Sequence, residues 1–154
     1  MPNEAKSLAL RWLSQRSLTV REVQERLKER GFDAGSVEMA VADLVRVSLL
    51  DDRRVADQVI ARGLARHEGP RHLAQRLVTR GVPRDVVDDV MQELRQRINW
   101  LEIAEPVGQR YDRSSPKGRA RLVRRLAREG FPGSVIRQMA EGEGSDDSDG
   151  IEDY

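Results

Sequence analysis

The chain has 154 residues, no cysteine and a formal net charge of +1. This length allows one domain or a short array of repeats with a real core, and the lack of cysteine excludes both disulfides and a thiolate metal site. No apolar run approaches the ~20 residues that a membrane-spanning helix needs, and the N-terminus lacks the features of a signal peptide, so we expect a soluble cytoplasmic protein without membrane contact.

The small net charge conceals a separation of charge along the chain. Residues 141–154 include seven acids and no lysine or arginine, so residues 1–140 hold 27 basic and 19 acidic side chains, a net charge of +8. The segment 62–84 contains six arginines and one acid, and the segment 110–137 contains nine basic residues and two acids. A basic body with an acidic tail favours a polyanionic partner, although charge runs also arise on faces that are merely solvated.

The first expected helix has apolar residues at the spacing of one helix face, at Ala5, Leu8, Ala9, Trp12 and Leu13. We interpret the tryptophan among them as a core residue. Thr19, followed three residues later by Glu22, forms a capping box that predicts the start of a second helix, and Gly31 predicts its end. A third helix completes a group spanning about 3–48.

Asp51 and Asp52 precede the next helical pattern. Adjacent carboxylates can suggest metal binding, but directly before an apolar-periodic segment we interpret them as helix caps. Pro70 suits the first position of the following helix, and Gly81 predicts its end. One more helix completes a second group spanning about 52–96.

A third group of helices spans about 97–140. Its first helix should extend toward Tyr111, but Pro106 removes a backbone hydrogen bond, so we expect a kink or an early end near Glu105. An N-cap and a first-turn proline, Ser115-Pro116, open the next helix.

One short sequence motif occurs three times, at 25–32, 75–82 and 124–131. Its glycines (Gly31, Gly81 and Gly130) are 50 and 49 residues apart. Such a repeat indicates stacked helical units, and no segment alternates for long enough to predict a strand. We therefore predict an all-α fold of three tandem three-helix repeats in an elongated, curved right-handed or solenoid-like array. Residues 1–141 are expected to form one repeat domain, and 142–154 a disordered acidic tail.

No catalytic pattern is present in the sequence. It lacks a phosphate-cradling glycine loop, His67 and His72 are five residues apart and form no recognisable metal-ligand motif, and the serines have no local histidine partner. We therefore expect no enzymatic activity, no metal and no cofactor.

The remaining chemistry is electrostatic. Equivalent arginines (Arg26, Arg76 and Arg125) directly precede the core leucine of each motif. One interpretation is structural: the aliphatic part of the side chain covers the core while the guanidinium pairs with a neighbouring acid. The arginines of 119–128 have only Glu129 to balance them, which is costly unless an anion binds. We predict that a basic face binds the phosphates of nucleic acid without reading bases. This face is made of Arg71, Arg76, Arg80, Arg84, Arg119, Arg121, Arg124, Arg125 and Arg128.

Taken in order, these features resemble the RecX family of regulators of the RecA recombinase. The likeness covers about residues 3–140 and lies in the order and spacing of the motifs. Its main elements are Arg11-Trp12-Leu13-Ser14-Gln15-Arg16-Ser17, Thr19, Glu22, Gly31-Phe32, Leu50-Asp51-Asp52, Gly69-Pro70, Gly81-Val82, Trp100, Ala104, Arg125-Leu126 and Gly130-Phe131. Pro106 and the acidic tail depart from the family pattern.

This resemblance implies a cytoplasmic, non-enzymatic protein that binds the RecA–single-stranded DNA filament and inhibits its ATPase, strand exchange and coprotease activities. It would thereby modulate recombination, DNA repair and the SOS response. We expect a monomer. Double-stranded DNA is left open as a further ligand, as are inhibition against activation and capping of filament ends against coating of the groove.

Two alternatives remain on the residues alone. One is a sequence-independent nucleic-acid-binding helical scaffold without a recombinase partner, and the other is a protein-interaction repeat whose basic face meets an acidic protein. A further hypothesis is that the acidic tail competes with DNA for the basic face, against the alternative that it is only a solubilising extension.

Overall fold

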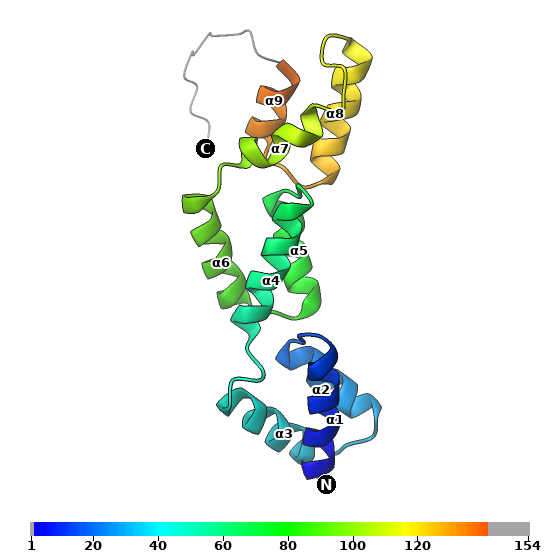
Figure 1. Cartoon of the computed structure of the whole chain (residues 1–154), viewed down its shortest axis with the longest axis vertical. Helices are drawn as coiled ribbons and strands as arrows, with labels where there is room; N and C mark the ends of the chain where they lie inside the picture. The colour runs from blue at the N-terminus through cyan, green and yellow to red at the C-terminus, as the bar shows by residue number, and fades with distance from the viewer. Residues whose placement is uncertain (1, 142–154) are drawn as a thin grey trace. The chain divides into compact units, whose positions relative to one another are not determined.

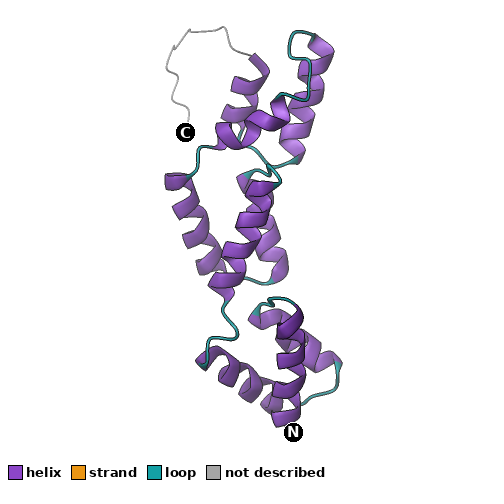
Figure 2. Cartoon of the chain, in the orientation of Figure 1, coloured by secondary structure: helices purple, strands orange, loops and turns teal. Residues whose placement is uncertain are grey.

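The computed structural model describes residues 2–141, and within that range it contains nine α-helices and no strand (Figures 1 and 2). The predicted all-α class is therefore confirmed. The acidic tail at 142–154 lies outside the described residues. Within residues 2–141, none of the helices combines the length and the apolar character needed to cross a bilayer.

The first repeat comprises α1 (Pro2–Gln15), α2 (Val20–Glu29) and α3 (Ala34–Arg46), with α3 packed against both other helices. Its core is built from fully buried apolar side chains, including Ala5, Ala9, Val23, Leu27 and Leu44, each at most 1% exposed. Burying a leucine or valine of this kind contributes about 1.5–3 kcal/mol. Trp12 is half-buried against this core, which agrees with its interpretation as a core residue.

Helix α2 begins and ends at the residues that the sequence predicted. The Thr19 hydroxyl accepts from the Glu22 backbone N–H, and the Glu22 carboxylate accepts from the Thr19 backbone N–H, so the capping box is complete. At the other end Gly31 adopts φ +88°, and Phe32 N–H donates to the Leu27 carbonyl. The same left-handed glycine and the same long backbone bond recur at Gly81–Val82 and Gly130–Phe131.

The second repeat comprises α4 (Asp52–Ala65), α5 (Pro70–Arg80) and α6 (Arg84–Arg97). Asp51 caps α4 as expected, since its carboxylate accepts from the backbone N–H groups of the two residues that follow Asp52. Asp52 lies in the first turn of α4, as expected, but its carboxylate accepts from Val20 N–H at 2.9 Å, so the helix amide that it caps belongs to α2. This contact is long-range, which is why a local pattern did not reveal it.

The third repeat comprises α7 (Trp100–Gly108), α8 (Pro116–Arg128) and α9 (Gly133–Glu141), and α9 packs against the other two helices. Helix α7 continues through Pro106 to Gly108, three residues past the end predicted near Glu105, although it still stops short of Tyr111. Pro106 has no N–H to donate to the carbonyl four residues before it, and the helix ends two residues after it.

The described chain forms two compact units whose boundary passes through α4 and α5. One unit contains the described residues up to Arg62 together with Leu73–Arg97. The other contains Gly63–His72 together with the described residues from Ile98 onward. The second unit thus holds α7, α8 and α9 with the turn that leads into α5.

Candidate nucleic-acid interface

One face of α8 carries a row of exposed cations at helical spacing. Its members are four, three and four residues apart, and we call them the α8 stripe: Lys117, Arg121, Arg124 and Arg128. The row extends over about 16 Å at 1.5 Å per residue. It lies on the side of α8 away from Leu122 and Leu126, which are fully buried.

The start of α8 is held by a cap and a tight loop. The Ser115 hydroxyl accepts from the Gly118 backbone N–H at 2.9 Å, and Pro116 occupies the first turn. A Cβ on Gly118 would lie 1.8 Å from the Asp112 carbonyl oxygen, so only glycine fits where this loop approaches the helix. Hydrogen bonds from Ser114 lower the pKa of Asp112, which keeps this loop carboxylate ionised.

The α8 stripe has no counter-charge within residues 2–141. Helix α8 contains no acidic residue, and no member of the stripe forms an ion pair with another described residue. The nearest acid in sequence, Glu129, lies 3.0 Å from the Arg125 Nε and so serves a different arginine. Like charges three and four residues apart destabilise a helix by a few tenths of a kcal/mol per pair, so a polyanion would relieve this repulsion.

Two predicted arginines of the same helix interact with other groups of the protein. Arg119 is half-buried, and its guanidinium donates to the Arg113 carbonyl at 2.9 Å. Arg125 is half-buried beside the core and pairs with Glu129. The exposed arginines of α8 are therefore Arg121, Arg124 and Arg128.

The predicted arginines of the second repeat fall in different surroundings. Arg71 is exposed, and its backbone N–H donates to the Gly130 carbonyl at 3.1 Å, which brings it beside the end of α8 in the same compact unit. Arg76, Arg80 and Arg84 belong to the other unit. Arg76 is half-buried, and Arg84 is exposed with its Nε 3.6 Å from the Asp88 carboxylate.

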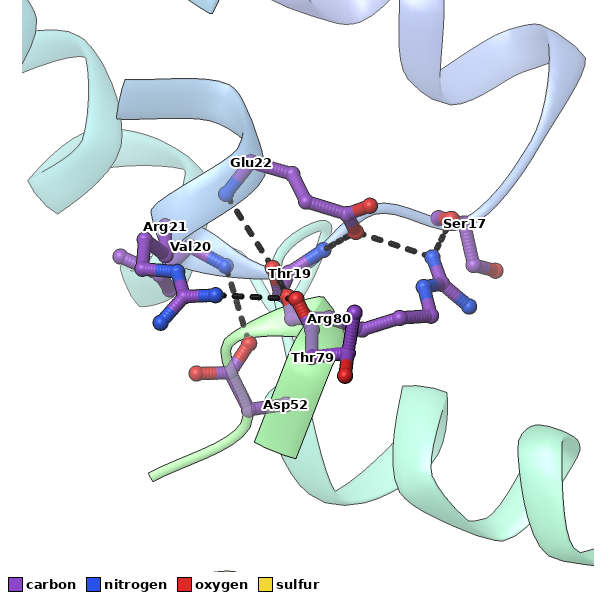
Figure 3. Close-up of polar contacts among 8 residues, drawn as sticks. All are labelled: Ser17, Thr19, Val20, Arg21, Glu22, Asp52, Thr79 and Arg80. Atoms are coloured by element: carbon purple, nitrogen blue, oxygen red, sulfur yellow. Dashed lines mark hydrogen bonds and ion pairs between the residues drawn. The ribbon is translucent and has the colours of Figure 1, made fainter. Parts of the chain in front are cut away.

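Arg80 lies at a junction between the first and second repeats, where it contacts the start of α2 (Figure 3). Its guanidinium donates to the Ser17 carbonyl at 3.0 Å and to the Glu22 carboxylate at 2.9 Å. Its own carbonyl accepts from the Thr19 hydroxyl at 2.7 Å. Only 18% of the Arg80 side chain is exposed, so it is a poor candidate for a direct phosphate contact.

A second arginine strengthens this junction. The Arg21 guanidinium donates to the Thr79 carbonyl at 2.9 Å, and its side chain crosses directly over Gly81. The residues of both contacts, here called the Arg80 latch, are Ser17, Thr19, Arg21, Glu22, Thr79 and Arg80.

Two carboxylates at this junction have displaced pKa values in opposite directions. Burial raises the pKa of Glu22, but hydrogen bonds from Arg80 and Thr19 outweigh burial, and the net pKa lies below its ordinary value. Burial raises the pKa of Asp52 above its ordinary value, and the bond from Val20 N–H reverses only part of that effect. Glu22 is thus held ionised by its partners, whereas ionised Asp52 is less well stabilised.

Lys117 lies outside the face predicted from the sequence. Its signal was available, because Lys117 continues the spacing of Arg121, Arg124 and Arg128 by one further helical turn. No local pattern indicated the contacts of Trp12, whose ring lies 5.6 Å from the Arg26 Cζ and 6.0 Å from the Arg30 Cζ. These cation–π contacts join α1 to α2.

Comparison with known proteins identifies relatives along nearly the whole chain. Residues 5–44 match the family model described as RecX, first three-helix domain. The chain is 34% identical to the regulatory protein RecX of Halorhodospira halophila, over 92% of this chain and 89% of that protein. It is 36% identical to a regulatory protein RecX of Thermus thermophilus, over 94% of this chain and 99% of that protein.

Solved structures with the same fold carry the same name. The crystal structure of RecX from Lactobacillus salivarius matches with a TM-score of 0.81 and 16% identity, over 91% of this chain and 94% of that chain. A second crystal structure, of regulatory protein RecX, matches with a TM-score of 0.78 and 22% identity, over 92% of this chain and 73% of that chain. The three-repeat helical fold is therefore one that other proteins of known structure share.

Proposed function

This chain belongs to the RecX family of regulatory proteins, and we propose that it regulates the RecA recombinase by binding the filament that RecA forms on single-stranded DNA. The proposed effect is inhibitory, opposing ATP hydrolysis, strand exchange and coprotease activity. Recombination, DNA repair and the SOS response would be restrained in consequence. The protein would act as a monomer and without catalysis of its own.

The observation that carries the DNA-binding part of this proposal is the α8 stripe. Four exposed cations on a helix without acids form a surface whose charge is complementary to a phosphate backbone. Such contacts position a protein on nucleic acid without reading bases. This suits a regulator that must bind filaments formed on DNA of any sequence. Arg71, beside the end of α8, would extend the same surface.

In the proposed mechanism, different surfaces of the protein bind DNA and RecA. The α8 stripe engages phosphates of the filament DNA, while other surfaces of the repeats contact neighbouring RecA subunits. A protein attached to both would hold adjacent subunits in place and oppose the turnover that filament growth requires.

The DNA-binding part is tested by replacing Arg121, Arg124 and Arg128 with glutamine and measuring affinity for single-stranded DNA by fluorescence anisotropy across a salt series. Each lost phosphate contact should reduce the log–log salt slope by about 0.7, so the triple variant should lose about 2 units of slope. Affinity at low salt should fall steeply for every DNA sequence alike.

A matched control has the same change in net charge at three exposed arginines of the other unit, Arg62, Arg95 and Arg97. This control should retain most of its affinity and slope. An unchanged slope in the α8 variant would place the DNA contacts elsewhere, and no binding of DNA by the unmodified protein would favour the protein-interaction alternative.

The regulatory part is tested with the DNA-dependent ATPase of the cognate RecA, with this protein added before or after the filament is assembled. Inhibition of preformed filaments at well below one molecule per RecA subunit would support regulation and favour capping of filament ends over coating of the groove. Inhibition only when the DNA is coated beforehand would reduce the protein to a competitor for DNA. That outcome would favour the nucleic-acid-binding scaffold without a recombinase partner.

A further inference from the structure

The first repeat has a hydrophobic core of its own. This core cluster runs from Ala5 to Leu50 and, among the described residues, takes no side chain from beyond Leu50. Hydrogen bonds and one ion pair, those of the Arg80 latch, join the start of α2 to the end of α5 (Figure 3). The first repeat and Leu73–Arg97 belong to one compact unit, yet a junction made by polar groups, beside a core that the first repeat completes alone, opens at a lower free energy than a shared core does.

The equivalent junction in the other unit is built differently. Given the spacing of the repeat glycines, Gly69 corresponds to Thr19, and Glu129 corresponds to Arg80. Gly69 N–H donates to the Glu129 carbonyl at 2.8 Å, and Arg71 N–H donates to the Gly130 carbonyl at 3.1 Å. These bonds join backbone to backbone, whereas each bond of the Arg80 latch that crosses its junction has a side-chain donor.

Close backbone approach makes the second junction tight. A Cβ on Gly69 would lie 2.4 Å from the Gly130 carbonyl carbon, so the two segments are in direct backbone contact. At the first junction the corresponding space holds the Arg21 side chain, which lies over Gly81. Side chains can rotate away without disturbing a helix, but a backbone contact of this kind cannot be broken so simply.

We propose that the Arg80 latch is a releasable joint, from which the folded first repeat detaches while the junction at Gly69 and Gly130 stays closed. Arg80 is its central residue because one guanidinium bonds both the chain before α2 and the carboxylate of the α2 capping box. When the joint opens, Arg80 and Arg21 exchange their protein acceptors for water, and α2 keeps its cap because Thr19 and Glu22 still bond each other. The first repeat therefore moves as a folded body.

Backbone hydrogen exchange, measured residue by residue by NMR, tests this proposal in the full chain. The Val20 N–H reports the joint, since its acceptor is Asp52 of the next repeat. The Gly69 and Arg71 N–H groups report the second junction, and the Leu27 N–H reports unfolding of the first repeat itself. In Arg80→Met, loss of charge-assisted bonds should accelerate exchange at Val20 by about tenfold or more, with the other three amides unchanged.

Two further variants distinguish opening of the joint from unfolding of the first repeat. Glu22→Gln removes the charge that pairs with Arg80 but keeps an acceptor for the capping box, so Val20 exchange should again accelerate while Leu27 does not change. Arg84→Met, at an exposed arginine outside the latch, should leave every reporter unchanged. Equal acceleration at Val20 and Leu27 would mean that the joint opens only when the repeat unfolds, and unchanged Val20 exchange would mean that Arg80 does not hold it; either result overturns the proposal.

Discussion

Arg26 and Arg125 occupy the same position in the first and third repeats, directly before a leucine that is fully buried. Both side chains are half-buried, but their charged heads have different partners. The Arg26 guanidinium lies over the Trp12 ring, whereas Arg125 pairs with Glu129 at 3.0 Å. One interpretation of the sequence paired the Arg26 head with a neighbouring acid, whereas the structure places an aromatic ring from another helix against it.

Residue surroundings also distinguish the glycines that end α2 and α8. Gly31 and Gly130 both have positive φ, at +88° and +84°. A Cβ on Gly31 would meet nothing within 4 Å, whereas one on Gly130 would lie 2.5 Å from the His72 backbone nitrogen. Gly31→Ala should cost about 1–2 kcal/mol for the left-handed conformation alone. Gly130→Ala should cost about 1–3 kcal/mol more because backbone must move.

Urea denaturation followed by circular dichroism measures both glycine variants against the unmodified chain. The comparison is internal, since both substitutions add one methyl group at the same position of the repeat. Equal losses of unfolding free energy would contradict the close approach at Gly130.

At the scale of the element, α8 combines a buried apolar face with an exposed face of one charge. Arg124→Glu places a carboxylate three residues after Arg121 and four before Arg128, so repulsion becomes attraction. We expect a gain of about 0.5–1 kcal/mol in stability at low salt, together with weaker DNA binding. Thermal unfolding at low ionic strength should show a rise of a few degrees in Tm.

The electrostatic origin of that gain has its own control. In about 1 M salt the Debye length falls to about 3 Å, so the Tm difference between Arg124→Glu and the unmodified chain should largely disappear. Arg124→Gln, which removes the repulsion without adding attraction, should show a smaller rise at low salt. A loss of stability in either variant would mean that Arg124 has a partner in the folded protein.

At the scale of the whole molecule, charge is distributed unevenly along the chain. Deleting residues 142–154 removes six acids and no basic residue, which changes the formal net charge from +1 to +7. We expect the truncated protein to bind DNA more tightly at low salt, with the difference shrinking as salt screens the charges. Anisotropy titrations of both lengths measure this, and equal affinities at low salt would leave the tail as a solubilising extension.

Much of the candidate site was predictable because it depends on a local pattern. Arg121, Arg124 and Arg128 were predicted from charge density on one helix, and they are exposed without an ion pair to another described residue. Arg80 was predicted for the same face on the same grounds, yet its side chain is committed to the junction with α2. Binding of DNA by the α8 stripe stays a prediction.

The sequence by itself determined where most helices begin and end, because caps, terminal glycines and apolar spacing act over one or two turns. The end of α7, which continues through Pro106, is an exception. The sequence also determined the repeat and the family, since both lie in the order of those signals. Only the tertiary structure decided which charged groups form hydrogen bonds or ion pairs with other groups of the folded protein. Arg80 bonds Glu22 across 58 positions and Val20 bonds Asp52 across 32, and no local spacing encodes contacts between residues so far apart.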